Sequence, residues 1–307
     1  MAALPPPPTP TLSAIYASYE ADTPDSFREH LGASIIGKEC LRALWYDFRW
    51  ALRQLFPGRM LRLFETGQLE EARLVRNLRR TGATVLDVDP ETGRQWRVEA
   101  HGGHFGGSFD GVAIGLLEAP KTWHLLEFKT HSAKSFAELK RDGVVKSKPQ
   151  HAAQMQVYMH LAGLSRAMYV AVCKNTDELH IERLKADHAT GEQLLAKAKS
   201  VIFAARPGPR ISDDPAWWQC RLCTYNRLCH GEPLAEFNCR TCLHATPVGG
   251  GWQCARHDRM LSAGKQRQGC ASHLFIPDLV PGEQIDAGDD HVLYRMPDGT
   301  LWRDGVS

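Results

Sequence analysis

Residues 106–158 put charged side chains in the middle of segments that otherwise have the pattern of buried strands. Apolar and β-branched residues on both sides of positions 118–121 predict two antiparallel strands joined by a short loop. Residues two apart on a strand face the same side, so Glu127 and Lys129 point together while Phe128 points the other way. The hairpin therefore carries charge where a core strand ordinarily does not.

The loop of this hairpin sets which residues face each other. With its centre between Ala119 and Pro120, Asp110 is predicted to lie directly opposite Lys129, and opposed residues project to the same face. Asp110, Glu127 and Lys129 are then expected to converge. Two carboxylates suit a divalent cation such as Mg²⁺, because hard cations take oxygen ligands. The lysine can orient or help to deprotonate a bound water, and the metal can stabilise charge on a phosphate.

A second polar pair follows on a predicted helix. Gln154 and Tyr158 lie four residues apart in an amphipathic run, so they share one helical face, which we expect to close the site. Each part of the pattern also has a common structural explanation. A Glu-x-Lys pair is typical of a solvated strand edge, Asp110 beside Gly111 is typical of a turn, and a helical tyrosine is typical of a core.

The order and spacing of these residues resemble those of the PD-(D/E)XK nuclease superfamily. The resemblance covers roughly residues 34–230 and is to the branch that contains RecB-type nuclease domains and phage recombination exonucleases. Phe109 stands in place of the proline that gives the motif its name, which is common in this branch. The residues that carry the resemblance are Asp110, Glu127, Phe128, Lys129, Gln154 and Tyr158.

This resemblance implies a role for each position. Asp110, Glu127 and the backbone carbonyl of Phe128 would bind Mg²⁺ or Mn²⁺. Lys129 would position the attacking water. The glutamine and tyrosine of the following helix would contact the substrate or support the site.

The resemblance also implies a third acidic ligand on an earlier helix, which the sequence predicts over residues 59–80. Related nucleases carry an acidic residue or a histidine there, and the spacing after a glycine favours Glu71 as the metal ligand. Glu70 is the alternative. Adjacent helical residues differ by 100 degrees in direction, so only one of the two can point inward.

Length and composition fit a soluble protein with one large core and a small appended module. The chain has 307 residues, of which 43% are hydrophobic and 23% charged. The formal charge of +2 excludes nothing, since a nucleic-acid binder need be basic only locally. Arginines crowd residues 42–80, which is compatible with a DNA-binding surface or with an ordinary solvated helix.

No long apolar run and no secretory signal are present, so we expect a cytoplasmic protein without a membrane span. Nine cysteines in a reducing compartment, several of them in Cys-x-x-Cys pairs, indicate metal binding rather than disulfides.

The predicted fold is α/β (α+β), with a restriction-endonuclease-like core in which helices flank a mixed central sheet. Residues 1–12 are expected to form a disordered or extended proline-rich leader, and residues 34–56 a helix. After residues 59–80 we expect a three-stranded meander, the Gln-Tyr helix, a strand pair and a final helix over 186–205. The predicted domains are 13–232, the nuclease with its cysteine-ligated cluster, and 233–307, a small Cys-rich metal module ending in a hairpin.

The first cysteine group follows a linker at residues 206–215. Cys220, Cys223 and Cys229 supply three thiolates, and structural zinc and iron–sulfur centres ordinarily take four ligands. His230 is the nearby fourth candidate and Cys40 the distant one. One cysteine before the core and three after it resemble the arrangement in iron–sulfur nucleases, which favours Cys40 and a four-iron four-sulfur cluster, with zinc as the alternative.

The second group is formed by Cys239, Cys242, Cys254 and Cys270. A Cys-x-x-Cys pair followed by two more cysteines predicts a tetrahedral structural zinc site, with His244, His257 and His273 as possible substitute ligands. Such a site contributes to folding rather than to catalysis, because four protein ligands leave no open position for water.

Together these features predict a Mg²⁺- or Mn²⁺-dependent DNA exonuclease of phage or prokaryotic recombination or repair. Two alternatives are a structure-specific endonuclease and a DNA-binding scaffold without catalysis. The expected partner is DNA. A recombination partner such as a single-strand-annealing protein is compatible with the resemblance but has no signal in the sequence.

Overall fold

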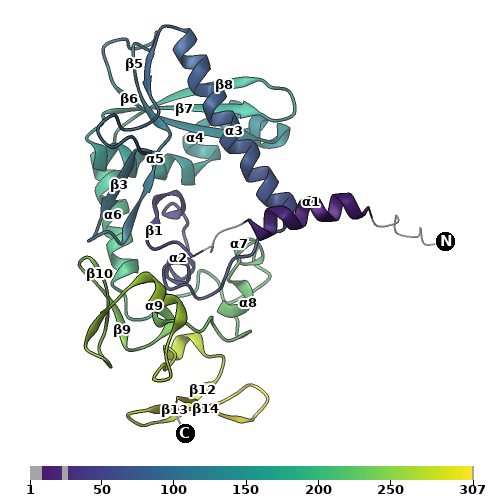
Figure 1. Cartoon of the computed structure of the whole chain (residues 1–307), viewed down its shortest axis with the longest axis vertical. Coiled ribbons are helices and arrows are strands. Elements are labelled where there is room, and N and C mark those ends of the chain that lie inside the picture. The colour runs from purple at the N-terminus through teal and green to yellow at the C-terminus, as the bar shows by residue number, and fades with distance from the viewer. Residues whose placement is uncertain (1–8, 23–26, 306–307) are drawn as a thin grey trace, which may run out of the picture.

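The computed structural model describes residues 9–22 and 27–305. A five-stranded sheet with the order β2-β5-β6-β7-β8 lies in the upper part of the molecule in Figure 1. Strands β6 and β7 run parallel, and the other neighbours are antiparallel. The predicted mixed sheet is confirmed. Its strands are β2 (Thr84–Leu86), β5 (Gly111–Ile114), β6 (His124–His131), β7 (Arg166–Cys173) and β8 (Leu179–Lys185).

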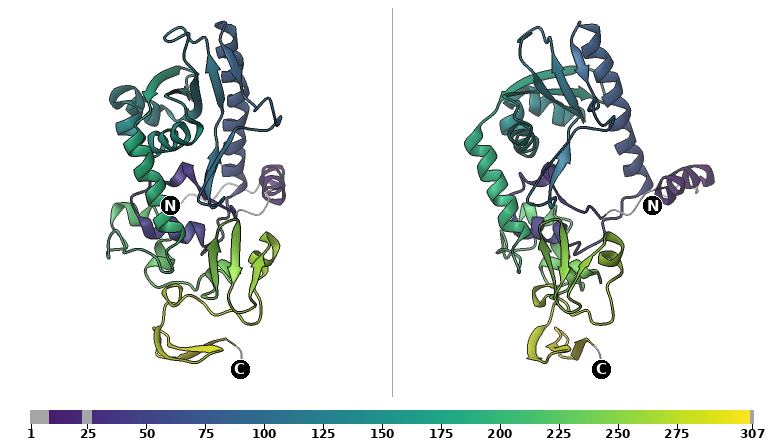
Figure 2. Two further views of the ribbon diagram at one scale, coloured as in Figure 1. Left: turned by 90° about the vertical axis from the view of Figure 1, so that its left-hand side faces the viewer. Right: turned by 60° about the vertical axis from the view of Figure 1, so that its left-hand side comes forward.

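Helices cover both faces of this sheet (Figures 1 and 2). Helix α3 (Gly58–Arg80) packs Leu74 and Leu78 in one apolar cluster with Phe128 of β6. Helices α4 (Ala133–Ser147) and α5 (Pro149–Ala162) pack on the opposite face, and α6 (His188–Ile202) lies beside α5. The predicted helices at 59–80 and 186–205 are confirmed. Between β6 and β7, however, there are two helices where one was expected, because the chain breaks at Lys148 before Pro149.

The predicted meander is formed by β2, β5 and β6. Two strands of a second small sheet, β3 and β4, come between β2 and β5 in the chain. That sheet has the order β1-β4-β3, from β1 (Leu31–Gly32), β3 (Arg97–Ala100) and β4 (Phe105–Ser108). Strand β3 was expected to lead into the central hairpin, but it pairs with β4 instead.

The predicted helix over residues 34–56 is much too long. A 3-10 turn, η1 (Ala33–Ile35), comes first, and α2 covers only Leu41–Phe48. Trp50 then adopts a left-handed backbone conformation with φ 54°, which ends the helix. After Phe48 the chain is irregular: Trp50 and Ala51 are buried, whereas Leu55 and Phe56 are exposed. The hydrophobicity of this segment cannot be told from that of a helix.

The register of the central hairpin differs from the prediction by two residues. Gly111 pairs with Leu126, so Asp110 comes opposite Glu127 and not opposite Lys129. The loop contains a turn bridged between Leu116 and Ala119, which moves its centre one position toward the N-terminus. Because the shift is an even number, the face assignment survives.

The predicted disordered leader falls largely on residues 1–8, outside the described residues. Its last part is helical, since α1 spans Pro10–Ala21 with Pro10 at the first helical position. Helix α1 packs against α3 (Figure 1).

The C-terminal part contains short elements around the cysteines. Helices α7 (Trp218–Arg221) and α8 (Asn226–Cys229) follow the linker. The Cys-rich module then forms one three-stranded sheet, and the chain ends in another that includes the predicted hairpin. These elements are η2 (Cys239–Thr241), β9 (Ala245–Val248), β10 (Gly251–Cys254), β11 (Arg259–Leu261), α9 (Ala263–Gln268), η3 (Pro277–Leu279), β12 (Glu283–Ala287), β13 (His291–Arg295) and β14 (Leu301–Gly305). Over residues 9–22 and 27–305, no helix combines the length and apolar character needed to cross a membrane.

Candidate active site

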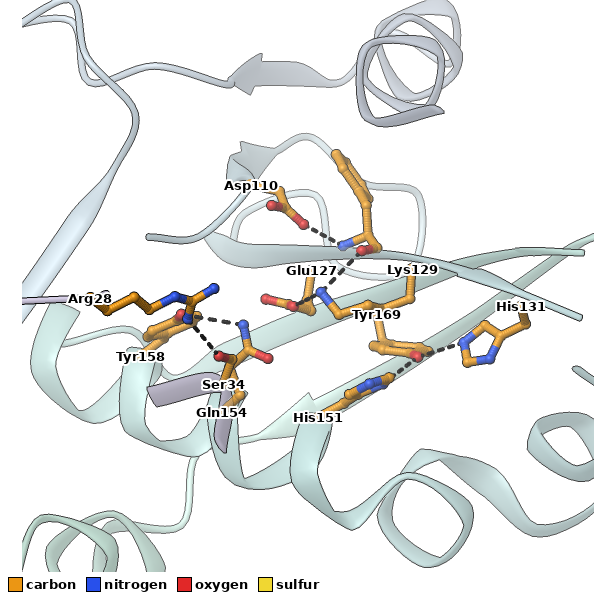
Figure 3. A network of polar contacts seen from close by, with 11 residues as sticks. Arg28, Ser34, Asp110, Glu127, Lys129, His131, His151, Gln154, Tyr158 and Tyr169 are labelled. Carbon is orange, nitrogen blue, oxygen red and sulfur yellow. Dashed lines mark hydrogen bonds and ion pairs between the residues drawn. The ribbon is translucent and has the colours of Figure 1, made fainter. Parts of the chain in front are cut away.

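Strand β6 supplies the central pair of the site (Figure 3). The Glu127 side chain is only 1% exposed, and its Oε1 accepts a hydrogen bond from Lys129 Nζ. Lys129 Nζ also donates to the backbone carbonyl of Phe128 at 3.2 Å. The second carboxylate oxygen of Glu127, Oε2, is buried and has no hydrogen-bond partner within the described structure.

Asp110 joins this pair from the residue that precedes β5. Its Oδ2 accepts a hydrogen bond of 2.6 Å from the backbone N–H of Phe128, which ties the carboxylate to the β6 strand. Asp110 also interacts electrostatically with Lys129. The structure thus brings Asp110, Glu127 and Lys129 together, as the sequence predicts.

Glu71 of α3 completes the acidic cluster, since its carboxylate interacts with Asp110 and Lys129. Glu70 points elsewhere and pairs with Arg73 at 3.3 Å, and Arg73 in turn pairs with Asp177. Of the two glutamates considered for a ligand, Glu71 is the one next to the other carboxylates.

Burial raises the pKa values of all three carboxyl groups, and repulsion by neighbouring carboxylates adds to the effect at Glu71 and Glu127. Burial, then the Asp110 charge, raise the pKa of Glu71 to about 7. Burial raises the pKa of Glu127 to about 7 against the opposing effect of Lys129, and it also raises the pKa of Asp110. Burial alone would lower the pKa of Lys129, but the carboxylates outweigh it and hold this pKa above its ordinary value. Three carboxyl groups face one ammonium, so the fully ionised cluster carries an excess of negative charge, which a bound cation would offset.

Helix α5 covers the cluster with the predicted Gln154 and Tyr158. Gln154 Nε2 donates to the Tyr158 hydroxyl at 3.2 Å, and both side chains are buried. A Cβ atom at Gly107 of β4 would clash with this hydroxyl. The absence of a side chain at Gly107 thus makes room for Tyr158.

Arg28 is a site residue that the sequence analysis missed. It lies just before β1, and Figure 3 shows its guanidinium beside Tyr158 and Gln154. Its Nη1 donates to Ser34 Oγ at 3.4 Å, and its side chain is exposed. No sequence motif includes Arg28, so the sequence alone does not mark it as a site residue.

A second missed group lies on the same face of β6. The Tyr169 hydroxyl of β7 is 2.8 Å from His131 Nε2 and 2.8 Å from His151 Nδ1 (Figure 3). Burial, then neighbouring lysines, lower the pKa of His131 to about 4 and that of His151 to about 3, so both imidazoles are neutral at pH 7. Tyr169 lies opposite Glu127 in the register of β6 and β7, so this network lies beside the catalytic candidates.

Three of the arginines of residues 42–80 are engaged in contacts within the fold. Arg49 is buried, Arg42 donates to the Gly208 carbonyl at 2.8 Å, and Arg79 pairs with Asp87 at 2.8 Å. These side chains stabilise the fold.

The first cysteine group lines one cavity of 380 Å³, and His230 lies in its wall as well. Burial, then Cys229, Cys40 and Cys223, raise the pKa of the Cys220 thiol. His230 Nε2 is buried without a hydrogen-bond partner in the described structure. Both candidates for a fourth ligand, Cys40 and His230, therefore reach this cavity.

The second cysteine group is gathered by η2 and β10. Burial, then the other three cysteines, raise the pKa of Cys239 to about 11. Cys254 is at the end of β10 and pairs with Ala245, whose N–H donates to the carbonyl of Cys242. His257 Nε2 lies 3.6 Å from Cys270 Sγ. His273 instead contacts Thr241 and Asn238, which leaves it inside the packing of η2.

The family model described as the PD-(D/E)XK nuclease superfamily matches residues 29–230, which is more than half of the chain. The chain belongs to the PD-(D/E)XK nuclease superfamily. The matched residues contain the acidic cluster, the Gln-Tyr helix and the first cysteine group, and they end before the second group. The predicted restriction-endonuclease-like core is thereby confirmed, together with membership of a nuclease superfamily.

The chain is similar to two solved structures of exonucleases, at low sequence identity. An alkaline exonuclease from Laribacter hongkongensis is 18% identical with a TM-score of 0.42, covering 60% of this chain and 90% of that one. A phage-related exonuclease from Haemophilus somnus is 12% identical with a TM-score of 0.35, covering 56% of this chain and 91% of that one. No curated protein matches the chain.

Superfamily members use divalent metals, and the acidic cluster fits one through its excess negative charge and the unpartnered Glu127 Oε2. As the side chains stand, no three His, Cys, Asp or Glu residues within 9–22 and 27–305 are grouped closely enough to hold a metal ion. At the acidic cluster, the Lys129 ammonium is bound to the Glu127 carboxylate and the Phe128 carbonyl. The ammonium therefore competes with a cation for these two oxygen atoms, whereas Glu127 Oε2 has no hydrogen-bond partner in the described structure.

Proposed function

We propose that this nuclease-superfamily protein is a Mg²⁺- or Mn²⁺-dependent exonuclease that hydrolyses DNA in phage or prokaryotic recombination or repair. The observation that carries the proposal is that Asp110, Glu127 and Lys129 meet on β6, where the second carboxylate oxygen of Glu127 is buried without a partner among the described residues. Exonuclease activity in particular rests on the branch of the superfamily that the motif resembles.

Each residue of the cluster has a role in this proposal. Asp110, Glu127, the Phe128 carbonyl and Glu71 would hold one or two cations. The bound cation would supply stabilisation of the negative charge that builds up on the phosphate. Lys129 orients the attacking water and stabilises its developing hydroxide through its ammonium group.

The reaction is an in-line hydrolysis of the phosphodiester. The water oxygen forms a bond to phosphorus while the bond to the leaving O3′ breaks, which leaves a 5′-phosphate and a 3′-hydroxyl. Gln154 and Tyr158, which are hydrogen-bonded to each other on the covering helix, would contact the substrate or support the site. The exposed guanidinium of Arg28 is placed to attract a substrate phosphate.

The cysteines are proposed to hold two further metal centres. Cys220, Cys223 and Cys229 with Cys40 would ligate a four-iron four-sulfur cluster, supported by their common cavity; zinc is the alternative. The second group would hold a structural Zn²⁺, supported by the burial of Cys239, Cys242 and Cys254.

Digestion of end-labelled linear DNA tests the proposal. With Mg²⁺ or Mn²⁺ we expect progressive loss of nucleotides from an end, and with chelator no cleavage. A circular single-stranded DNA should stay intact; its cleavage would indicate an endonuclease. Binding of DNA without any degradation would indicate a scaffold and contradict the proposal.

Lys129→Ala tests the mechanism in the same assay. The variant should lose cleavage by at least roughly 100-fold, because the water is no longer oriented, while DNA binding persists. Lys134→Ala removes an exposed lysine from the start of α4 and serves as the control for loss of one positive charge. Full cleavage by Lys129→Ala would refute the role given to this lysine.

A further inference from the structure

We propose that Trp50 and Arg240 clamp two consecutive backbone carbonyls and thereby position Arg28 to bind a substrate phosphate. The inference rests on the proposed function, because Arg28 needs a phosphate-bearing substrate. It makes the C-terminal Cys-rich module, which lies outside the superfamily match, a supporting part of the substrate site.

The clamp holds the backbone directly at Arg28. Trp50 Nε1 donates to the Arg28 carbonyl at 2.6 Å, and Arg240 Nη2 donates to the Glu29 carbonyl at 2.9 Å. The Arg240 guanidinium lies 3.7 Å from the centre of a Trp50 ring, so the two donors form one stacked unit. Two adjacent peptide groups are therefore fixed by one pair of side chains.

Arg240 is an unusual residue to bury. Its side chain is only 1% exposed, and no carboxylate neutralises it by a direct hydrogen bond in the described structure. Its remaining donors go to the Phe48 carbonyl at 3.0 Å and to Gln266 Oε1 at 2.9 Å. Burying a charged group is costly, and here each hydrogen bond joins η2 of the Cys-rich module to another segment or to α9.

Trp50 is strained as well as buried. Its φ of 54° is in the left-handed region, which is unfavourable for a residue other than glycine. The Trp50 carbonyl accepts a hydrogen bond of 3.1 Å from Asn238 Nδ2, again from the Cys-rich module. The surrounding structure thus holds Trp50 in the one conformation that directs its indole N–H at the Arg28 carbonyl.

The side chain of Arg28 leaves this fixed backbone toward the active site. Its guanidinium is exposed and lies beside Tyr158 and Gln154, where it contacts Ser34 Oγ at 3.4 Å (Figure 3). A long flexible side chain binds a phosphate more tightly when its origin is already fixed, because less conformational entropy is lost on binding. The clamp supplies that preorganisation.

The test is the salt dependence of DNA binding, measured by fluorescence anisotropy with a labelled duplex oligonucleotide in chelator, so that cleavage plays no part. Arg28→Ala should weaken binding by about tenfold and reduce the slope of log K against log salt by about 0.9, the value for one lost phosphate contact. Trp50→Phe keeps an aromatic face for Arg240 but lacks the indole N–H. We expect it to change affinity and slope in the same direction as Arg28→Ala.

Double variants decide whether the clamp acts through Arg28. Trp50→Phe and Arg240→Met should each add nothing to Arg28→Ala, because the contact that they position is already gone. The inference would be overturned if the affinity losses of the single variants multiply in the double variants. A wild-type salt slope for Trp50→Phe would also overturn it. If Arg240→Met fails to fold, Trp50→Phe alone carries the test.

Arg49→Met is the matched control for stability. Arg49 is also buried and donates to the Arg240 and Ala245 carbonyls at 3.2 and 3.0 Å, but it makes no hydrogen bond to residues 28–29. It should lower the melting temperature and leave the salt slope unchanged; a reduced slope would contradict a specific clamp. Wild-type cleavage in Mg²⁺ is measured in parallel, so that failure of the nuclease proposal is seen separately.

Discussion

At the residue scale, Glu127 concentrates the chemistry of the site in one buried carboxylate. One oxygen holds Lys129, and the other has no hydrogen-bond partner in the described part of the chain. An arrangement of this kind is unfavourable in a protein interior unless a further ligand relieves it. The unpartnered carboxylate oxygen thus lowers the stability of the metal-free protein and provides a ligand for a cation.

Because of this cost, the stability of the metal-free protein should depend on pH, and Glu127→Gln should remove that dependence. Burial raises the pKa of Glu127 to about 7, whereas a carboxyl group of an unfolded chain titrates near about 4.3. The folded protein binds this proton more tightly, so its stabilising effect is present at low pH and is lost as the pH rises through about 7. Between pH 5 and 8, the metal-free wild type should lose on the order of 2 kcal/mol relative to Glu127→Gln.

Chemical denaturation in chelator at several pH values measures this difference. Glu70→Gln is the control, because Glu70 pairs with Arg73 away from the cluster. Parallel pH curves for the wild type and Glu127→Gln would show that the carboxylate is not strained. Added Mn²⁺ should remove the loss at pH 8, since it binds the charged form.

At the scale of elements, the local sequence pattern predicts a helix or strand correctly where one hydrophobic periodicity runs through the whole segment. The alternation along β6 correctly placed Glu127 and Lys129 on one face, and the run over 59–80 correctly gave α3. The predicted helix over 34–56 was wrong because the left-handed turn at Trp50 depends on contacts with Asn238, far along the chain. Arg28 was missed for the same reason, since its place in the site is fixed by residues distant in sequence.

Strand β4 and helix α5 meet so closely that a methyl group between them should impair the site. Gly107→Ala fits the backbone, but its Cβ would clash with the Tyr158 hydroxyl and push α5 from the cluster. We expect a loss of about 1–3 kcal/mol in unfolding free energy, as for overpacked cores. Cleavage should fall as well.

Tyr158→Phe gives the matching test, because it removes the hydroxyl that the methyl group meets. Combined with Gly107→Ala, it should recover part of the lost stability. Gly67→Ala is the control, since a Cβ there meets open space on α3 and alanine favours a helix. Equal effects of Gly107→Ala with and without the tyrosine hydroxyl would refute the clash.

At the scale of the whole molecule, contacts between distant segments hold the two ends of the nuclease core together. Gln219 donates to Glu39 at 2.8 Å, and Tyr225 donates to Asp47 at 3.0 Å. Glu39, Gln219 and Tyr225 line the cavity of the first cysteine group. A cluster ligated by Cys40 and Cys220 would be a cross-link between these ends. Closing so long a loop lowers the entropy of the unfolded chain by an amount worth about 5 kcal/mol.

The spacing of the cysteines could predict such a centre, but it could not choose the fourth ligand, because Cys40 and His230 both reach the cavity. Purified without oxygen, the wild type should be brown and contain iron. Cys40→Ser should lose most of the iron and visible absorbance and unfold at a lower temperature, since the cross-link is broken, whereas His230→Ala should keep both. The reverse result would make His230 the ligand. A colourless wild type with stoichiometric zinc at this group would replace the iron–sulfur proposal with its alternative, in which the same four side chains hold the core ends by a single Zn²⁺ ion.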